Sequence, residues 1–199
     1  MFIVFGLLMI LVYITRDHML LEPGSFLRQR YAAIPWLMVL HGAFGALALF
    51  LGIFQFSTRL RQRYLKVHRA MGYMYIIGVA VSGPVAVRVA TILFVPTLLM
   101  ASVIQASGWI VTTATALYCV RTGRIQQHRE WMMRSYPFAM VFVVVRAILA
   151  IPAIARTGQV GIATVVWSVI ATACFLPSFV IAWQALAASR RSGKARDAA

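Results

Sequence analysis

The chain has 199 residues, of which 62% are hydrophobic, and its mean hydropathy is +0.84. A soluble domain is usually about half apolar, so this composition argues against a soluble fold. The net charge is +15, but the basic residues cluster between apolar runs of roughly 20 residues, the length that spans a bilayer. This clustering argues against nucleic acid as the partner and favours the anionic lipid head groups of the cytoplasmic leaflet.

The first apolar run, residues 1–15, has no basic region before it and no small-residue cleavage site after it. These features predict a short retained helix rather than a signal peptide. A polar stretch with a turn at Pro23-Gly24 follows. Longer apolar runs then predict further helices over residues 34–56, 70–90, 97–120, 132–155 and 160–188.

The predicted fold is all-α, a polytopic transmembrane helix bundle of six spans. Its most basic segments are residues 57–69, 121–134 and 190–199. With six spans, these segments lie on the same side as both termini, and the positive-inside rule assigns that side to the cytoplasm. Residues 1–189 are predicted to form a single transmembrane domain, and residues 190–199 a disordered basic cytoplasmic tail.

Polar residues from several predicted helices fall at similar heights in the outer half of the bundle. Counted from the predicted cytoplasmic helix ends, His41, Gln105 and Arg146 lie roughly 21 to 22 Å up. The first helix brings His18 to a similar height. An arginine at this depth costs about 2.5 to 3.5 kcal/mol unless it is paired or reaches water. We therefore expect Arg146 to face a shared interior with His41 and Gln105.

The partner of Arg146 is left open by the sequence. Backbone carbonyls, water, Asp17, an acid on another chain or an anionic ligand would each satisfy the guanidinium. The side chain could instead snorkel outward.

His41 is the only histidine well inside a predicted span. It is either a hydrogen-bonded packing residue or a functional group, which would be a haem or metal ligand or a proton-exchanging side chain. A b-type haem with two axial histidine ligands needs the two histidines to face each other at one height. His18 is the candidate partner of His41 for such a haem or for a metal ion. His68 and His128 are a second candidate pair at the cytoplasmic ends, in a plan that resembles the transmembrane cytochromes b.

Two His-Arg pairs, His68-Arg69 and His128-Arg129, each open a predicted helix after a basic turn, and they stand 60 residues apart. This echo indicates either a duplicated helical hairpin or a chance similarity of two cytoplasmic turns. Free backbone N–H groups and the helix dipole favour anions at such positions. The candidate anions are a lipid phosphate, a quinone head group, a haem propionate and a phosphorylated substrate.

A set of motifs occurs in a characteristic order along the chain. The set comprises His41, Gly52-Ile53-Phe54-Gln55-Phe56, Arg59-x-Arg61-x-Arg63, His68-Arg69-x-x-Gly72-Tyr73-x-Tyr75 and His128-Arg129-x-Trp131-Met132-x-Arg134-Ser135. Together these motifs resemble the bacterial membrane proteins catalogued as domain of unknown function 2306, over residues 31–146. Two positions depart from the family pattern: Ile53-Phe54 replaces Gly-Pro, and Tyr73 stands after Gly72 where members have Arg. The resemblance implies a multi-pass protein of the bacterial inner membrane and no particular activity.

Three functions are consistent with these features. The one that we favour is a redox-type membrane protein that binds haem or quinone through His41 and the polar layer. The others are a carrier with an anion site at Arg146 and a catalytically silent accessory subunit that pairs with other membrane subunits. Hydrolytic catalysis is disfavoured, since no predicted span interior carries a carboxylate base, and whether the protein is an enzyme is left open by the sequence.

Overall fold

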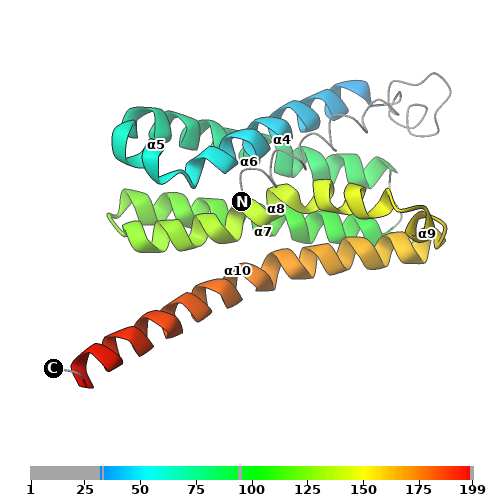
Figure 1. The fold of residues 1–199 in the computed structure, drawn as a ribbon. Coiled ribbons are helices and arrows are strands. Elements are labelled where there is room, and N and C mark those ends of the chain that lie inside the picture. The colour runs from blue at the N-terminus through cyan, green and yellow to red at the C-terminus, as the bar shows by residue number, and fades with distance from the viewer. Residues whose placement is uncertain (1–31, 33, 94–95, 198–199) are drawn as a thin grey trace.

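The computed structural model describes residue 32, residues 34–93 and residues 96–197. Within this part of the chain the regular elements are helices, and no strand is present. The helices, labelled as in Figure 1, are α4 (Pro35–Gln55), α5 (Thr58–Arg63), α6 (Leu65–Leu93), α7 (Pro96–Arg121), α8 (Ile125–Leu149), α9 (Pro152–Ala155) and α10 (Gly158–Asp197). The predicted first helix, residues 1–15, lies outside the described residues.

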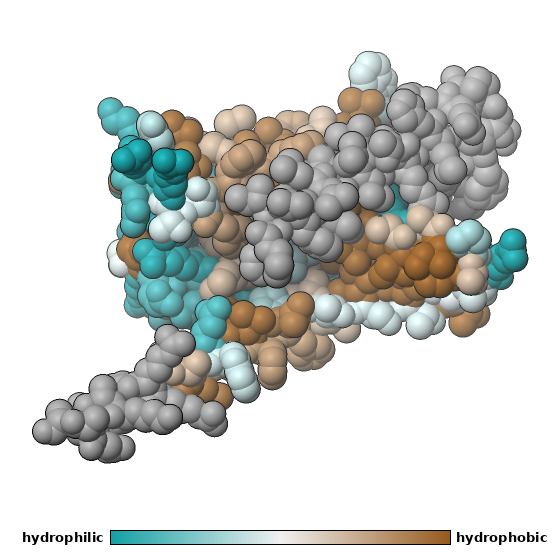
Figure 2. Space-filling model, viewed as in Figure 1, coloured by the Kyte–Doolittle hydropathy of each residue, from teal (hydrophilic) through white to brown (hydrophobic). Residues whose placement is uncertain are grey.

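Five of the described helices, α4, α6, α7, α8 and α10, are long and apolar enough to cross a membrane. This finding confirms an all-α, multi-pass membrane protein, while the sixth span and the cytoplasmic termini stay predictions. Apolar side chains cover much of the middle of the visible face, and polar ones gather at the end that carries α5 (Figure 2).

Four of these helices close into a ring around a common core. Helix α4 packs on α6, α6 on α7, α7 on α8, and α8 packs back on α4. Helix α10 packs against α8 and α7, and its C-terminal half points away from the bundle (Figure 1). The core contains Ala48, Tyr75, Trp109, Phe138 and Val141. The ring therefore encloses side chains from four helices that are distant in sequence.

Glycines allow neighbouring helices to approach closely. A Cβ on Gly78 would lie 2.8 Å from the carbonyl oxygen of Phe44 and 2.9 Å from the Cβ of Ala48, so α6 touches the backbone of α4. A Cβ on Gly108 would likewise meet the ring of Phe138, at 2.6 Å. Small residues at such crossings are typical of helix association in lipid, where close packing supplies much of the stability.

The structure corrects the predicted helix starts on the basic side. Helix α6 begins at Leu65 rather than residue 70, and α8 begins at Ile125 rather than residue 132. Apolar runs mark the hydrocarbon zone, whereas helices continue beyond it because lysine and arginine are good helix formers and reach the head groups. Part of the predicted 57–69 loop also forms α5, where the Ser57 hydroxyl accepts a hydrogen bond from the Leu60 N–H at 3.3 Å.

The other end of the predicted fifth helix is divided. Helix α8 ends at Leu149, and α9 begins with Pro152 in its first turn. Proline disfavours helical backbone in the residue before it, and Ile151 is accordingly extended, with ψ of 116°. Helix α10 continues to Asp197, so the backbone is helical through most of the segment predicted as a disordered tail.

Candidate functional site

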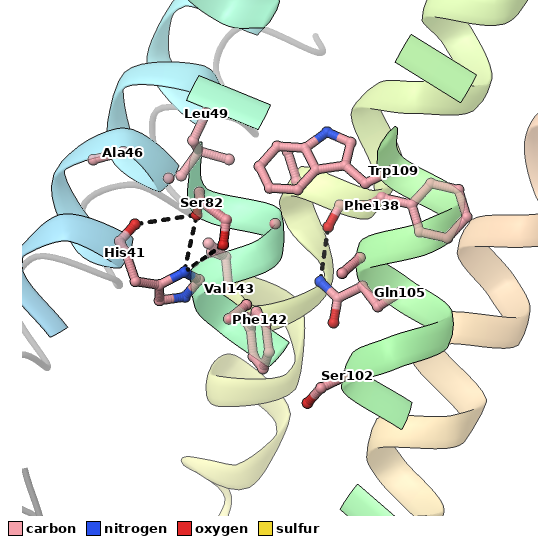
Figure 3. A pocket seen from close by; sticks show the side chains of 15 residues that line it. His41, Ala46, Leu49, Ser82, Ser102, Gln105, Trp109, Phe138, Phe142 and Val143 are labelled. Carbon is pink, nitrogen blue, oxygen red and sulfur yellow. Dashed lines mark hydrogen bonds between the residues drawn. The ribbon is translucent and has the colours of Figure 1, made fainter. Parts of the chain in front are cut away.

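A cavity of about 50 Å³ lies between the ring helices (Figure 3), and on α4 it is lined by His41, Gly45, Ala46 and Leu49. This volume holds about three or four water molecules. All four ring helices line the cavity. Its polar lining residues are His41, Ser82, Ser102, Gln105 and Trp109. The cavity thus joins two of the sequence-predicted site residues, His41 and Gln105.

Ser82 holds the ring of His41 in place (Figure 3). His41 Nδ1 lies 2.9 Å from Ser82 Oγ and 3.2 Å from the Ser82 carbonyl oxygen, while Ser82 Oγ donates to the His41 carbonyl oxygen at 3.1 Å. Because a carbonyl oxygen can only accept, these contacts place a proton on Nδ1. A neutral His41 therefore keeps a lone pair on Nε2, which can accept a hydrogen bond or a proton.

Gln105 and Ser102 also have their donors directed into the protein. Gln105 is 6% exposed, and its Nε2 donates to the Phe138 carbonyl oxygen at 3.0 Å. The Ser102 hydroxyl donates to the Leu98 carbonyl oxygen at 3.0 Å. A molecule in the cavity would therefore meet three hydrogen-bond acceptors, which are His41 Nε2, Gln105 Oε1 and Ser102 Oγ. The one remaining donor among these side chains is the second amide hydrogen of Gln105.

Arg146 lies in the last turn of α8, where its charge is favoured by the helix dipole. It is half-buried and interacts electrostatically with His41, but it does not line the cavity. Counted from Ile125, Arg146 stands roughly 31 Å along α8, compared with roughly 21 Å for His41 from the end of α4. Phe142, four residues before Arg146, lines the cavity, and its ring centroid lies 6.2 Å from that of His41, so Arg146 stands one helical turn further along α8, outside the lining.

A second polar cluster adjoins the cavity at Trp109, which also lines the cavity. Trp109 Nε1 donates to the Tyr75 hydroxyl at 3.0 Å, the Tyr75 and Ser135 hydroxyls lie 2.8 Å apart, and Ser135 Oγ lies 2.7 Å from Thr113 Oγ1. Thr113 donates to the Trp109 carbonyl oxygen at 2.7 Å. Since Thr113 has one proton, Ser135 must donate to Thr113 and Tyr75 to Ser135. The cluster is closed and satisfied, so it joins α6, α7 and α8 rather than offering a binding site.

Sequence reasoning missed this cluster, although a signal for it was present. Tyr75 and Ser135 are separated by 60 residues, the same separation as His68 and His128. His68 and His128 also lie close enough to interact electrostatically. Equivalent positions of two repeats touch each other only at the axis that relates the repeats. Contacts of this kind are what a duplicated hairpin related by a two-fold axis would produce, and the duplication stays an interpretation.

His68 and His128 lie one turn inside their helices. The backbone N–H of His68 donates to the Tyr64 carbonyl oxygen and that of His128 to the Arg124 carbonyl oxygen. The prediction that these residues carry free N–H groups is therefore wrong, and the reason is again the earlier start of α6 and α8. The side chains of Arg69 and Arg129, which follow these histidines, are exposed.

The two histidine side chains differ in their hydrogen bonds. His128 Nδ1 donates to the Ala116 carbonyl oxygen at 2.9 Å. His68 Nδ1 is buried without a partner among the described residues, as is Nε2 of Gln55, whose side chain is 9% exposed. Two unsatisfied buried polar atoms at one end of the bundle call for an explanation, because each costs about 1 to 3 kcal/mol.

The haem and metal predictions receive no support from the described residues. His18, the candidate partner of His41, lies outside them. Between the described histidines, cysteines and acids there is no group of three that could hold a metal ion. The cavity at His41, at about 50 Å³, is also far smaller than the roughly 300 to 1,000 Å³ of cofactor-sized sites. Haem binding stays a prediction.

Comparison of the chain with known proteins identifies its family and nothing more specific. The family model described as "Predicted membrane protein (DUF2306)" matches residues 38–186, a range that includes His41, Gln105 and Arg146. No curated protein and no solved structure matches the chain. The match covers most of the chain and confirms the resemblance carried by the motifs. The chain therefore belongs to the membrane protein family catalogued as domain of unknown function 2306.

Proposed function

We propose that the protein is a membrane carrier for a small, uncharged solute that donates hydrogen bonds. The observation that carries this proposal is the polar cavity inside the ring, lined by helices of both hairpins. Many secondary transporters are built from repeats, and their substrates bind within the membrane at the repeat interface. The cavity between α4–α6 and α7–α8 occupies the corresponding position.

The chemistry of the lining selects the class of solute. His41 Nε2, Gln105 Oε1 and Ser102 Oγ are acceptors, so a guest rich in N–H or O–H groups is bound better than an anion. The positive charge of Arg146 acts on His41 and opposes a cation in the cavity. The volume of about 50 Å³ limits the guest to a few heavy atoms. A small amide, amine or alcohol in its neutral form meets all three conditions.

This proposal replaces the anion carrier that the sequence indicated, because Arg146 stands outside the cavity lining. No described contact favours the redox or the accessory-subunit hypothesis. The redox hypothesis remains testable by a visible spectrum of the purified protein with a pyridine extract for haem. The accessory-subunit hypothesis remains testable by co-purification of a larger complex.

The carrier proposal is tested by solute flux into proteoliposomes. Urea and ammonia serve as small neutral donors, and formate and nitrate serve as anions of similar size. We expect the protein to accelerate the entry of at least one neutral donor and of neither anion. His41→Phe should abolish the acceleration, because it removes the acceptor and the contacts with Ser82. Trp36→Phe, on the same helix at a side chain that is 83% exposed, should preserve it.

Two results would contradict the proposal. Nitrate or formate flux that requires Arg146 would restore the anion carrier. Equal fluxes in protein-containing and empty vesicles for all four solutes would remove transport of this class altogether.

A further inference from the structure

We infer that the cytoplasmic end of the bundle holds a binding site for a phosphate group, formed by Gln55 and His68 beside Arg61 and Arg69. None of these four residues lines the cavity at His41. Its argument uses different residues and does not depend on the carrier proposal.

The side chains of Gln55 and His68 lie along the same face of α6. A Cβ on Gly72 would lie 3.5 Å from Gln55 Oε1, so the amide of Gln55 rests against Gly72. Gly72 and His68 are four residues apart in α6 and therefore share one face of the helix. Within the part of the chain that the structure describes, Gln55 Nε2 and His68 Nδ1 are both buried without a partner. The Gln55 amide is a donor without an acceptor, and His68 Nδ1 becomes a second donor in the tautomer or charge state that protonates it.

The surroundings of these donors are strongly positive. Arg61, Arg69 and His128 all interact electrostatically with His68. The only carboxylate between residues 34 and 189 is Glu130, and it is engaged elsewhere. Its Oε1 accepts from Gln126 Nε2 at 3.1 Å, and its Oε2 lies 4.0 Å from Arg134. A bound anion would offset the repulsion among these basic groups.

A phosphate group fits both requirements. Its oxygens accept several hydrogen bonds at once, and guanidinium groups bind them in a favourable planar geometry. A water molecule would satisfy Gln55 and His68 but would leave the positive charge uncompensated. The phosphodiester of an anionic lipid and a soluble phosphate share this chemistry, and the basic turn lies where either is present.

The inference is tested with the full chain in dodecyl maltoside micelles, which contain no phosphate. The apparent melting temperature is measured in the detergent alone, with added inorganic phosphate, and with added phosphatidylglycerol. A ligand that binds the folded state raises the melting temperature with its concentration. An increase with phosphatidylglycerol alone identifies a lipid head group, and an increase with inorganic phosphate identifies a soluble source. Either increase supports a phosphate site, provided that it depends on Gln55.

The deciding variant is Gln55→Leu, which removes the unsatisfied amide and so should fold at least as well as the native chain. We expect it to weaken the ligand about tenfold, the usual effect of losing one hydrogen bond to a charged group. Arg63→Gln, in the same basic segment, removes one charge but leaves Arg61 and Arg69, the arginines that interact with His68, and should leave the increase almost intact. Equal increases in the native protein and in Gln55→Leu, or no increase with either ligand, would overturn the site. Gln55 and His68 would then enclose water only.

Discussion

At the scale of single residues, the buried hydroxyl of Tyr75 depends closely on its hydrogen-bond partners. It accepts from Trp109 and donates to Ser135, and Ser135 donates in turn to Thr113. Each of these groups satisfies its neighbour, so the removal of one leaves another buried and unpaired. Such clusters in membrane helices specify which faces meet, because lipid supplies no alternative partner.

Tyr75→Phe tests the importance of this cluster for stability. The substitution keeps the ring but leaves the Trp109 N–H and the Ser135 hydroxyl with lost partners, so we expect the free energy of unfolding to fall by about 1 to 3 kcal/mol. Reversible unfolding of the protein in mixed micelles by sodium dodecyl sulfate measures the change. Tyr73→Phe is the matched control, because Tyr73 lies on the same helix and is 54% exposed. Equal losses of unfolding free energy in the two variants would show that the hydrogen-bonded cluster does not stabilise the protein.

At the scale of helices, the contact between α4 and α6 depends on the absence of a side chain. Gly78 faces the backbone of α4 at Phe44, whereas a Cβ added to Gly42 on α4 would meet no atom of the described residues within 4 Å. The two glycines therefore differ in packing while both lie in helical backbone. Helix propensity alone favours alanine at both positions by up to about 1 kcal/mol.

Gly78→Ala and Gly42→Ala should consequently change stability in opposite directions. The new methyl group at Gly78 must push α4 away from α6, and we expect a loss of about 1 to 3 kcal/mol. At Gly42 the same change should be neutral or stabilising, since no described neighbour stands in its way. The same micelle unfolding assay measures both variants. A stabilising effect at Gly78 would mean that the two helices do not touch there.

At the scale of the whole molecule, the basic segments gather at one end. Helix α5, the turn between α7 and α8, and the C-terminal end of α10 lie at the same end of the bundle in Figure 1. Helix α9 and the start of α4 lie at the other end. The positive-inside rule thus still predicts that the end with α5 faces the cytoplasm.

Reporter fusions test this orientation. Fusions after Arg63, Arg124 and Ala199 should all report the cytoplasm, and a fusion after Thr157, beyond α9, should report the opposite side. Alkaline phosphatase and green fluorescent protein provide complementary readouts. A non-cytoplasmic result at Arg124 would contradict the order of spans in the ring.

Some features of this protein were determined by the sequence alone. Long apolar runs and basic turns predicted membrane helices close to α4, α6, α7, α8 and α10, because the bilayer imposes its thickness on any chain that crosses it. The motifs around His41, His68 and His128 identified the family. Helix ends were predicted less well, since apolar content reports the hydrocarbon zone and helices such as α6 and α8 extend past it.

The tertiary structure decided which side chains meet. Heights along single helices placed Arg146 in one layer with His41 and Gln105, but a layer does not specify how each helix is rotated or where it begins. Packing put His41 and Gln105 at one cavity and moved Arg146 beyond it. Packing also joined Tyr75 to Ser135, which hydropathy cannot anticipate because hydrogen bonding between helices depends on their mutual orientation.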